Sequence, residues 1–231
     1  MNKEDAIQIP VYLEVGEKRV FACALKWMGW SRSGGDEETA LKALFEYGPH
    51  YARAIEGAQT RFTMPDSVSE FRIVERLKGD ATTDFGAPAA VPAFDLEPID
   101  EAELERLLAL LQACWQAFDT AVEAATGKEL RKGPRGGGRE LEKIIRHVME
   151  SEAGYLSSLG WKHKVGEGKD LGEELRRIRS ATLEGLTRAA HGELPEFGPR
   201  GGRHWRPRQF ERRTAWHVLD HAWEIEERSN S

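Results

Sequence analysis

The feature that most constrains the fold of this chain is a series of helical segments in its second half. Between Asp100 and Gly127, apolar residues recur three and four positions apart, on one face of a helix; they are Leu104, Leu107, Leu108, Leu111, Trp115, Phe118 and Val122. Similar segments cover about 139–159, 170–191 and 207–228. Four helices of this length joined by loops predict a four-helix bundle with up-down-up-down topology.

The first part of the chain is patterned for strands instead. Alternating apolar residues predict strands at 8–15 and 19–25, joined as a β-hairpin across a turn at Gly16. Residues 69–77 alternate in the same way and predict a third strand. Between them, Asp36 is a good N-cap for a helix that extends to about Ile55. These elements indicate a small α+β domain.

A segment rich in proline and alanine separates the two patterns. Residues 86–98 have no periodic apolar face, which is typical of a connector. The sequence therefore predicts an α+β protein of two domains: a small domain over 1–85, a Pro/Ala linker over 86–98 and a helical domain over 99–231.

Composition excludes several classes of function. The formal net charge is −6, which does not favour bulk binding of nucleic acid. No apolar run approaches the length of a membrane span, and no secretory signal is visible, so we expect a soluble, cytoplasmic protein. Cys23 and Cys114 lie in apolar segments and are expected in the core, although one disulfide is compatible with the sequence.

The pentapeptide GPRGG occurs twice, at 133–137 and 198–202, each time before a predicted helix. In an up-down-up-down bundle both copies lie at the same end. Glycine-rich backbone at a helix N-terminus favours anions, so the two loops predict an anion-binding site that includes Arg135, Arg139, Arg200 and Arg203. The alternative is that glycine and proline only turn the chain.

Three of the seven histidines lie on predicted helices. His217 and His221 are four residues apart, which places them on one side of the fourth helix, about 6 Å apart along its axis. This spacing lets two imidazoles reach one metal ion. His147 lies about two turns into the second helix. If both helices start at the same end, the three rings reach a similar depth, and the sequence predicts a metal site of three histidines.

The stretches RHV at 146–148 and WHVLDHAWE at 216–224 resemble the DinB/YfiT-like superfamily, over about residues 98–228. Members are four-helix bundles, bacterial in type, whose metal is held by one histidine of the second helix and two of the fourth. The resemblance implies that His147, His217 and His221 are the ligands. Characterised relatives include bacillithiol and mycothiol S-transferases, so it also implies a thiol S-transferase.

Three imidazoles leave open positions on a divalent metal ion, and Zn²⁺ and Ni²⁺ both suit these ligands. A thiol bound there becomes a thiolate nucleophile at neutral pH, and a bound water would become a stronger nucleophile too. Asp220 and Glu224 are candidates to orient the rings or transfer protons, and Tyr155 could contribute a phenol. The same side chains also fit a solvated acidic face and a core tyrosine.

Residues 21–41, FACALKWMGWSRSGGDEETAL, resemble the HicB-like α+β module, in which a strand and loop precede a helix of the EEAL type. The resemblance implies the fold of the first domain. The expected function is a metal-dependent transferase acting on a low-molecular-weight thiol or another anionic ligand. The main alternative is a non-catalytic binding or stress-associated protein, as a homodimer; a HicB-type regulator is the third.

Overall fold

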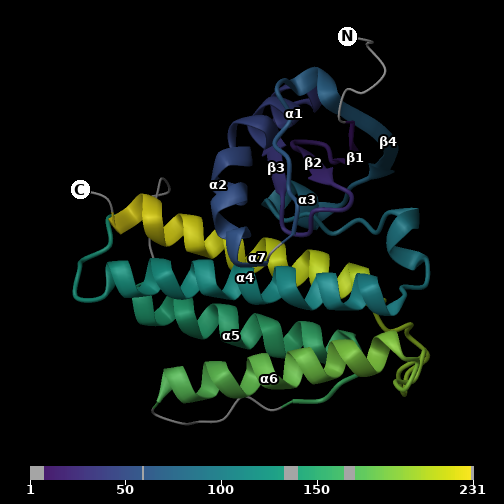
Figure 1. The fold of residues 1–231 in the computed structure, drawn as a ribbon, viewed down its shortest axis with the longest axis vertical. Helices are drawn as coiled ribbons and strands as arrows, with labels where there is room; N and C mark the ends of the chain where they lie inside the picture. The colour runs from purple at the N-terminus through teal and green to yellow at the C-terminus, as the bar shows by residue number, and fades with distance from the viewer. Residues whose placement is uncertain (1–7, 59, 133–139, 164–169, 230–231) are drawn as a thin grey trace. The chain divides into compact units, whose positions relative to one another are not determined.

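The chain has an α+β fold that divides into two units, Met1–Glu97 and Pro98–Ser231. The computed structural model describes residues 8–58, 60–132, 140–163 and 170–229. A mixed β-sheet lies in the first unit and long helices follow in the second (Figure 1). The predicted α+β class is therefore confirmed.

The sheet of the first unit has four strands in the order β3-β2-β1-β4. They are β1 (Ile9–Val15), β2 (Val20–Ala24), β3 (Ser31–Gly34) and β4 (Phe71–Lys78). β2 pairs antiparallel with both β1 and β3, whereas β4 pairs parallel with β1. The strands predicted from the sequence do not include β3, because its Ser-Arg-Ser-Gly sequence carries no apolar alternation; pairing with β2 makes it a strand.

Short helices complete this unit: α1 (Glu37–Glu46), α2 (Gly48–Ala54), α3 (Ala81–Phe85), and the 3₁₀ turns η1 (Glu56–Ala58), η2 (Val68–Glu70) and η3 (Ala93–Leu96). The Asp36 side chain caps α1 by accepting a hydrogen bond from the Thr39 amide at 2.8 Å. The single helix expected over 36–55 is wrong. The helix is interrupted at Tyr47, because Pro49 has no N–H to continue α1.

A buried carboxylate ties the end of the first unit to its sheet. Glu14 of β1 is fully buried and accepts hydrogen bonds from the Thr83 hydroxyl and from the amides of Ala89 and Ala90. The Ala93 amide donates to Glu75 of β4 at 3.1 Å. The Pro/Ala-rich segment is thus held on the first unit by backbone hydrogen bonds to side chains of the sheet.

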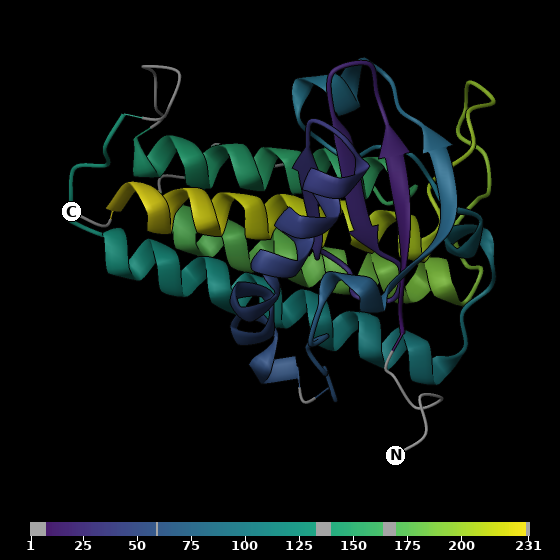
Figure 2. The same ribbon diagram turned by 90° about the horizontal axis from the view of Figure 1, so that it is seen from above.

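The second unit consists of four long helices that run side by side (Figures 1 and 2). They are α4 (Glu101–Ala125), α5 (Leu141–Ser158), α6 (Leu171–Ala190) and α7 (Pro207–Ser229). α7 packs along α4 and α5, and α6 packs against α5. All four helices contribute to one apolar core, which includes Leu104, Met149, Leu156, Ile178, Leu186 and Phe210.

α4 and α7 run in the same direction. Near their first residues, Arg208 Nε lies 3.0 Å from Glu103 Oε1. Just beyond the last residue of α4, the Arg131 amide donates to the Arg228 carbonyl of α7 at 3.0 Å. The predicted up-down-up-down topology places these two helices antiparallel, so it is wrong.

α5 and α6 run in the opposite direction to α4 and α7. The Trp205 amide, just before α7, donates to the Ser158 carbonyl at the end of α5 at 2.8 Å. Gly185, late in α6, lies against Leu156, late in α5. The order of the four helices is therefore up-down-down-up.

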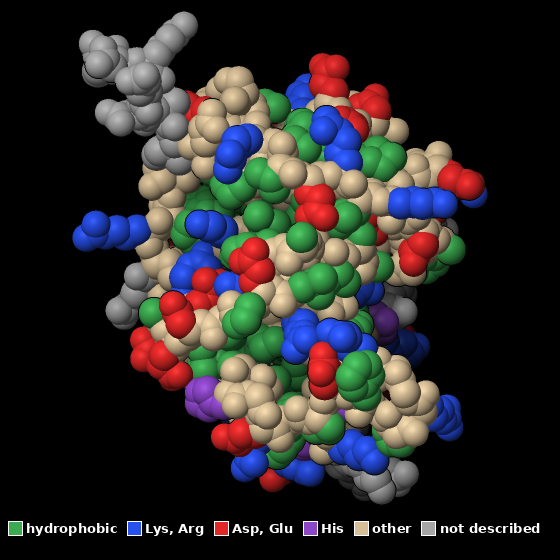
Figure 3. Space-filling model, turned by 90° about the vertical axis from the view of Figure 1, so that its right-hand side faces the viewer, with side chains coloured by type: hydrophobic (Ala, Val, Ile, Leu, Met, Phe, Trp, Pro, Cys, Tyr) green, Lys and Arg blue, Asp and Glu red, His purple; other side chains and the backbone are tan. Residues whose placement is uncertain are grey.

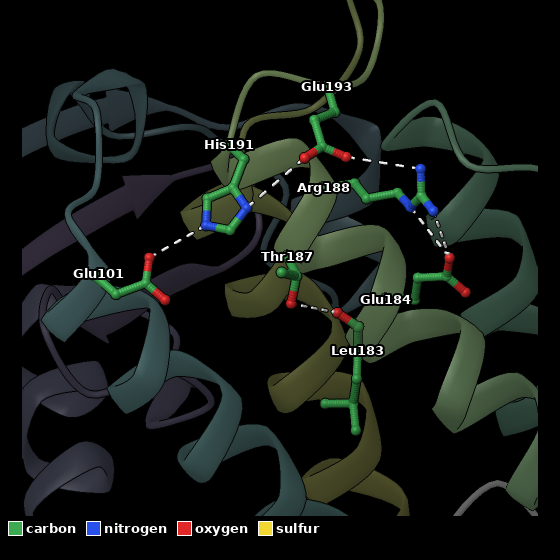
Figure 4. A network of polar contacts seen from close by, with 7 residues as sticks. All are labelled: Glu101, Leu183, Glu184, Thr187, Arg188, His191 and Glu193. Atoms are coloured by element: carbon green, nitrogen blue, oxygen red, sulfur yellow. Dashed lines mark hydrogen bonds and ion pairs between the residues drawn. The ribbon is translucent and has the colours of Figure 1, made fainter.

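A surface network links the end of α6 to the start of α4 (Figure 4). His191 Nε2 lies 3.2 Å from Glu101 Oε2, and Arg188 forms ion pairs with Glu184 and Glu193. These side chains are all substantially exposed, so each pair contributes little to stability.

Candidate metal centre

Three histidines from two helices converge in the second unit. His217 and His221 lie on successive turns of α7, and His147 lies on the neighbouring α5. One nitrogen from each ring falls within 4.8 Å of the others. The Nε2 atoms of His147 and His217 are 3.3 Å apart. Metal–nitrogen bonds of about 2.0 Å place tetrahedral ligands roughly 3.3 Å apart, so this pair already has the spacing of ligands to a first-row divalent metal.

The direction of α5 explains how the rings come to one level. His147 lies about 9 Å from the start of α5, and His221 lies about 12 Å from the end of α7, at a rise of about 1.5 Å per residue. These ends of the two helices lie on the same side because α5 and α7 are antiparallel. The expectation that both helices start at the same end is wrong.

The rings differ in their access to solvent. His217 and His221 retain only 6% and 8% of their exposed surface, whereas His147 is half-buried. The three rings pack edge to face, with centroids 4.6 to 5.1 Å apart. The cluster is therefore held by packing on the α7 side, and the His147 side is the more accessible to a small molecule.

A carboxylate forms a hydrogen bond with one of the histidines. Glu224 Oε2 lies 2.8 Å from His221 Nδ1, and Glu224 Oε1 lies 2.6 Å from Arg228 Nη1. The hydrogen bond from His221, with the Arg228 guanidinium, holds the pKa of Glu224 below its usual range. An ionised carboxylate on Nδ1 fixes that nitrogen as the donor, which leaves Nε2 of His221 as the nitrogen that could bind a metal ion.

The other two candidate catalytic residues differ in their position. The Tyr155 ring on α5 meets His217 edge to face, with centroids 5.7 Å apart. Asp220 lies half-buried on α7 between His217 and His221. Among the described residues, the histidines alone form the group of converging His, Cys, Asp and Glu ligand atoms, and Asp220 does not join it.

The anion site predicted between the two GPRGG loops stays a prediction, because the structure describes only one of the two loops. Arg135 and Arg139, with the first copy, lie outside the described residues. The helix ends that flank the first copy, Ala125 and Leu141, lie where α7 ends, whereas the second copy precedes the start of α7. The described residues that flank the two copies therefore lie at opposite ends of the helices, and the expectation that both copies lie at the same end lacks their support.

The second GPRGG copy forms a tight turn. The Gly198 amide donates to the Gly202 carbonyl at 2.8 Å, and Gly201 takes a positive φ of 79°. Arg203 Nη1 pairs with Glu196 at 2.9 Å, and Arg200 is exposed. This copy therefore turns the chain, and its arginines lie in a surface turn rather than with the histidines.

Sequence reasoning missed an arginine beside the candidate centre. The Arg213 guanidinium carbon lies 5.5 Å from the centre of the Tyr155 ring and 5.0 Å from that of Trp216. Tyr155 also stacks on Trp205, with centroids 5.6 Å apart. The signal was available in the sequence, because Arg213 precedes His217 by four residues and so shares its side of α7.

Charge on the surface is mixed in sign on the face drawn in Figure 3, where Lys and Arg side chains are interspersed with Asp and Glu.

Within the described residues, none of the helices combines the length and the apolarity that crossing a membrane requires. Cys23 and Cys114 are both buried and both free thiols.

Comparisons with models of protein families, with characterised proteins and with solved structures gave no match for this chain. The chemistry of the centre therefore has to be inferred from its own side chains. Three imidazoles without a carboxylate or thiolate ligand favour Zn²⁺ or Ni²⁺ over Mg²⁺ or Ca²⁺.

Proposed function

We propose that the second unit is a DinB-type four-helix bundle that holds one divalent metal ion on His147, His217 and His221. We further propose that it transfers a low-molecular-weight thiol to an electrophile. The observation that carries the proposal is the convergence of the three ring nitrogens within 4.8 Å, with Glu224 bound to His221. A histidine held by a carboxylate is the usual arrangement for a metal ligand, because the carboxylate orients the ring and raises its basicity.

The protein contributes ligands and a restricted approach to the reaction. A bound Zn²⁺ or Ni²⁺ lowers the pKa of a coordinated thiol, so that the sulfur is present as thiolate at neutral pH. In the transfer, the sulfur forms a bond to an electrophilic carbon, and the leaving group departs with the electrons of the bond that breaks. The half-buried His147 side admits the thiol, and the Tyr155 ring borders His217 at the same place.

Metal content tests the first part of the proposal. We expect the purified full chain to hold about one equivalent of Zn²⁺ or Ni²⁺, measured by elemental analysis, as a three-histidine site requires. His147→Ala should reduce this at least about tenfold, because two imidazoles remain. His191→Ala is the matched control, since this surface histidine of α6 pairs with Glu101 instead. Equal metal content in the unmodified protein and His147→Ala would contradict the site.

Thiol conjugation tests the second part. The metal-loaded protein should accelerate the reaction of a small thiol with monobromobimane, followed by fluorescence, and a chelator should abolish the acceleration. Restoring the metal should restore it. A protein that holds the metal in this centre but leaves the conjugation rate unchanged with every thiol tried would instead be a binding protein, which was the main alternative.

A further inference from the structure

A series of polar contacts leads from the candidate metal centre to the segment that follows α4. His221 Nδ1 lies 2.8 Å from Glu224 Oε2, and Glu224 Oε1 lies 2.6 Å from Arg228 Nη1. The Arg228 Nε then donates to the Arg131 carbonyl at 2.8 Å. The side chains of Glu224 and Arg228 thus connect a candidate metal ligand to the backbone of Arg131, which lies 97 residues before Arg228 in the chain.

The segment after α4, residues 126–132, depends on hydrogen bonds more than on burial. Leu130 is half-buried, and the other residues of the segment are exposed. The Arg131 amide donates to the Arg228 carbonyl at 3.0 Å, and the Arg131 side chain donates to the Glu227 carbonyl. Carbonyls in the last turn of a helix lack partners within the helix, so a cationic donor stabilises them. Arg131 therefore fastens this segment to the end of α7.

Arg228 occupies the central position in this series. Its side chain is buried, and two of its nitrogens have different partners: Nη1 pairs with Glu224, and Nε donates to Arg131. Because a guanidinium is planar, fixing Nη1 also fixes the direction in which Nε donates. The position of the Glu224 carboxylate therefore affects how well Arg228 holds the Arg131 carbonyl.

The metal centre bears on the other end of the same series. With a metal ion on His221 Nε2, rotation of the ring is restricted, and its Nδ1–H points in one fixed direction toward Glu224. The carboxylate is then held between a fixed donor and Arg228. Binding at the centre and attachment of the segment thus favour the same arrangement of Glu224 and Arg228.

We propose that Arg228 is a positioning residue of the metal centre and that it couples metal binding to the attachment of segment 126–132 on α7. This inference rests on the proposed three-histidine site and adds a regulation of that site. Coupling between two sites is reciprocal, so a change that detaches the segment weakens metal binding by the same factor by which the metal stabilises the attachment. The segment is then a part of the protein through which metal affinity can be adjusted from outside the centre.

Hydrogen exchange of the Arg131 amide measures the attachment directly, because this amide donates to the Arg228 carbonyl. The full chain is compared by NMR after treatment with a chelator and after loading with Zn²⁺. Zinc should slow exchange of the Arg131 amide at least about fivefold, the lower end of the usual coupling between sites. The Gly198 amide, which donates to the Gly202 carbonyl in a surface turn, is the internal control and should change little.

Substitutions of Arg228 test the link itself. In Arg228→Gln, zinc should no longer slow exchange of the Arg131 amide, and the affinity for zinc should fall about fivefold. Arg228→Lys keeps the charge but not the planar group and should retain part of both effects, which covers the case in which Arg228→Gln fails to fold. Arg188→Gln is the matched control, since Arg188 also pairs with a glutamate four residues earlier in the last turn of a helix, and it should retain both effects in full.

The outcomes separate this inference from the metal site. If the unmodified protein competes with a chromophoric chelator for no zinc, the three-histidine site is overturned, and the coupling with it. If zinc binds but the Arg131 amide exchanges at the same rate, or slows no more than the Gly198 amide, the coupling alone is overturned. Protection of the Arg131 amide by zinc that persists in full in Arg228→Gln would overturn the role of Arg228.

Discussion

Glu14 of the first unit and Glu152 of the second are both fully buried but have contrasting surroundings. Glu14 of the sheet accepts hydrogen bonds at both carboxylate oxygens, from Thr83, Ala89 and Ala90. Glu152 of α5 accepts one from the Trp115 indole at 2.5 Å, and its Oε2 has no hydrogen-bond partner among the described residues. The first carboxylate is satisfied by the fold, whereas the second is buried with an oxygen that the helices leave unmatched.

The surroundings of Glu152 alter its protonation. Burial raises the pKa of Glu152 from 4.5 to about 7, against the opposing attraction of Arg179 and the Trp115 hydrogen bond. A protonated carboxyl costs less in an apolar helical core than a charged one. The comparison teaches that the first unit uses its buried acid to fasten a chain segment, whereas the helical unit buries an acid whose charge varies near neutral pH.

The largest expected effect comes from removing the satisfied carboxylate. Glu14→Ala should lower the free energy of unfolding by about 3 to 5 kcal/mol, because it leaves the buried Thr83 hydroxyl and two partly buried amides without their acceptor. Chemical denaturation measures the loss. Glu75→Ala is the control, since this more exposed residue accepts one hydrogen bond from the Ala93 amide. Equal losses of unfolding free energy in both variants would show that the hydrogen bonds to Glu14 stabilise the fold no more than the single one to Glu75.

The next largest effect is the pH dependence that Glu152 causes. Its folded-state pKa lies above its unfolded value, so its stabilisation is complete below pH 4.5 and is lost as the pH rises through about 7. Between pH 5 and 8 the unmodified protein should lose about 2 to 3 kcal/mol of stability through this group.

Glu152→Gln isolates that contribution, because the amide keeps an acceptor for Trp115 but does not titrate. The difference in unfolding free energy between the two proteins should change with pH, moving in favour of the variant as the pH rises. Other titrating groups are common to both proteins and cancel in the difference. Parallel stability curves from pH 5 to 8 would contradict the contrast between the two glutamates.

The sequence predicted the long helices and the α+β class because apolar periodicity is a local property. It did not predict the direction of each helix, because the length of the connection after Ser158 does not determine whether α6 runs parallel or antiparallel to α5. Glu14 lies within the apolar strand VYLEV, and its donors come from about 70 residues later, so no local pattern reveals its role. Tertiary pairing decided both features.

The candidate centre was only partly predictable for the same reason. The spacing of His217 and His221 is local and identified them as a pair, but adding His147 required the relative depth of two helices. We expected the rings at a similar depth on helices that run parallel, whereas the structure brings them together on antiparallel ones. Arg213 was overlooked because the arginines were assessed with their glycine-rich loops rather than by their side of α7.

A smaller effect, on metal affinity, is expected from the Glu224 carboxylate that pairs with His221. Glu224→Gln should weaken the affinity for Zn²⁺ or Ni²⁺ about 10- to 100-fold, because a neutral amide orients His221 less firmly and lowers its basicity. Competition with a chromophoric chelator measures the change. Glu226→Gln, two residues along α7, should leave the affinity unchanged. A Glu224 variant with unaltered affinity would make this carboxylate a partner of Arg228 alone.

The smallest effect is expected from a histidine that also pairs with a glutamate, but at the surface. His191 and Glu101 keep 44% and 68% of their side-chain exposure, against 11% and 33% for His221 and Glu224 (Figure 4). His191→Ala should therefore change the free energy of unfolding by no more than about 0.5 kcal/mol, because water screens an exposed pair. Thermal unfolding at pH 6 and 8 checks this. A larger loss, or any loss of bound metal, would show that burial is not what distinguishes the histidines of the centre from the others in the same unit.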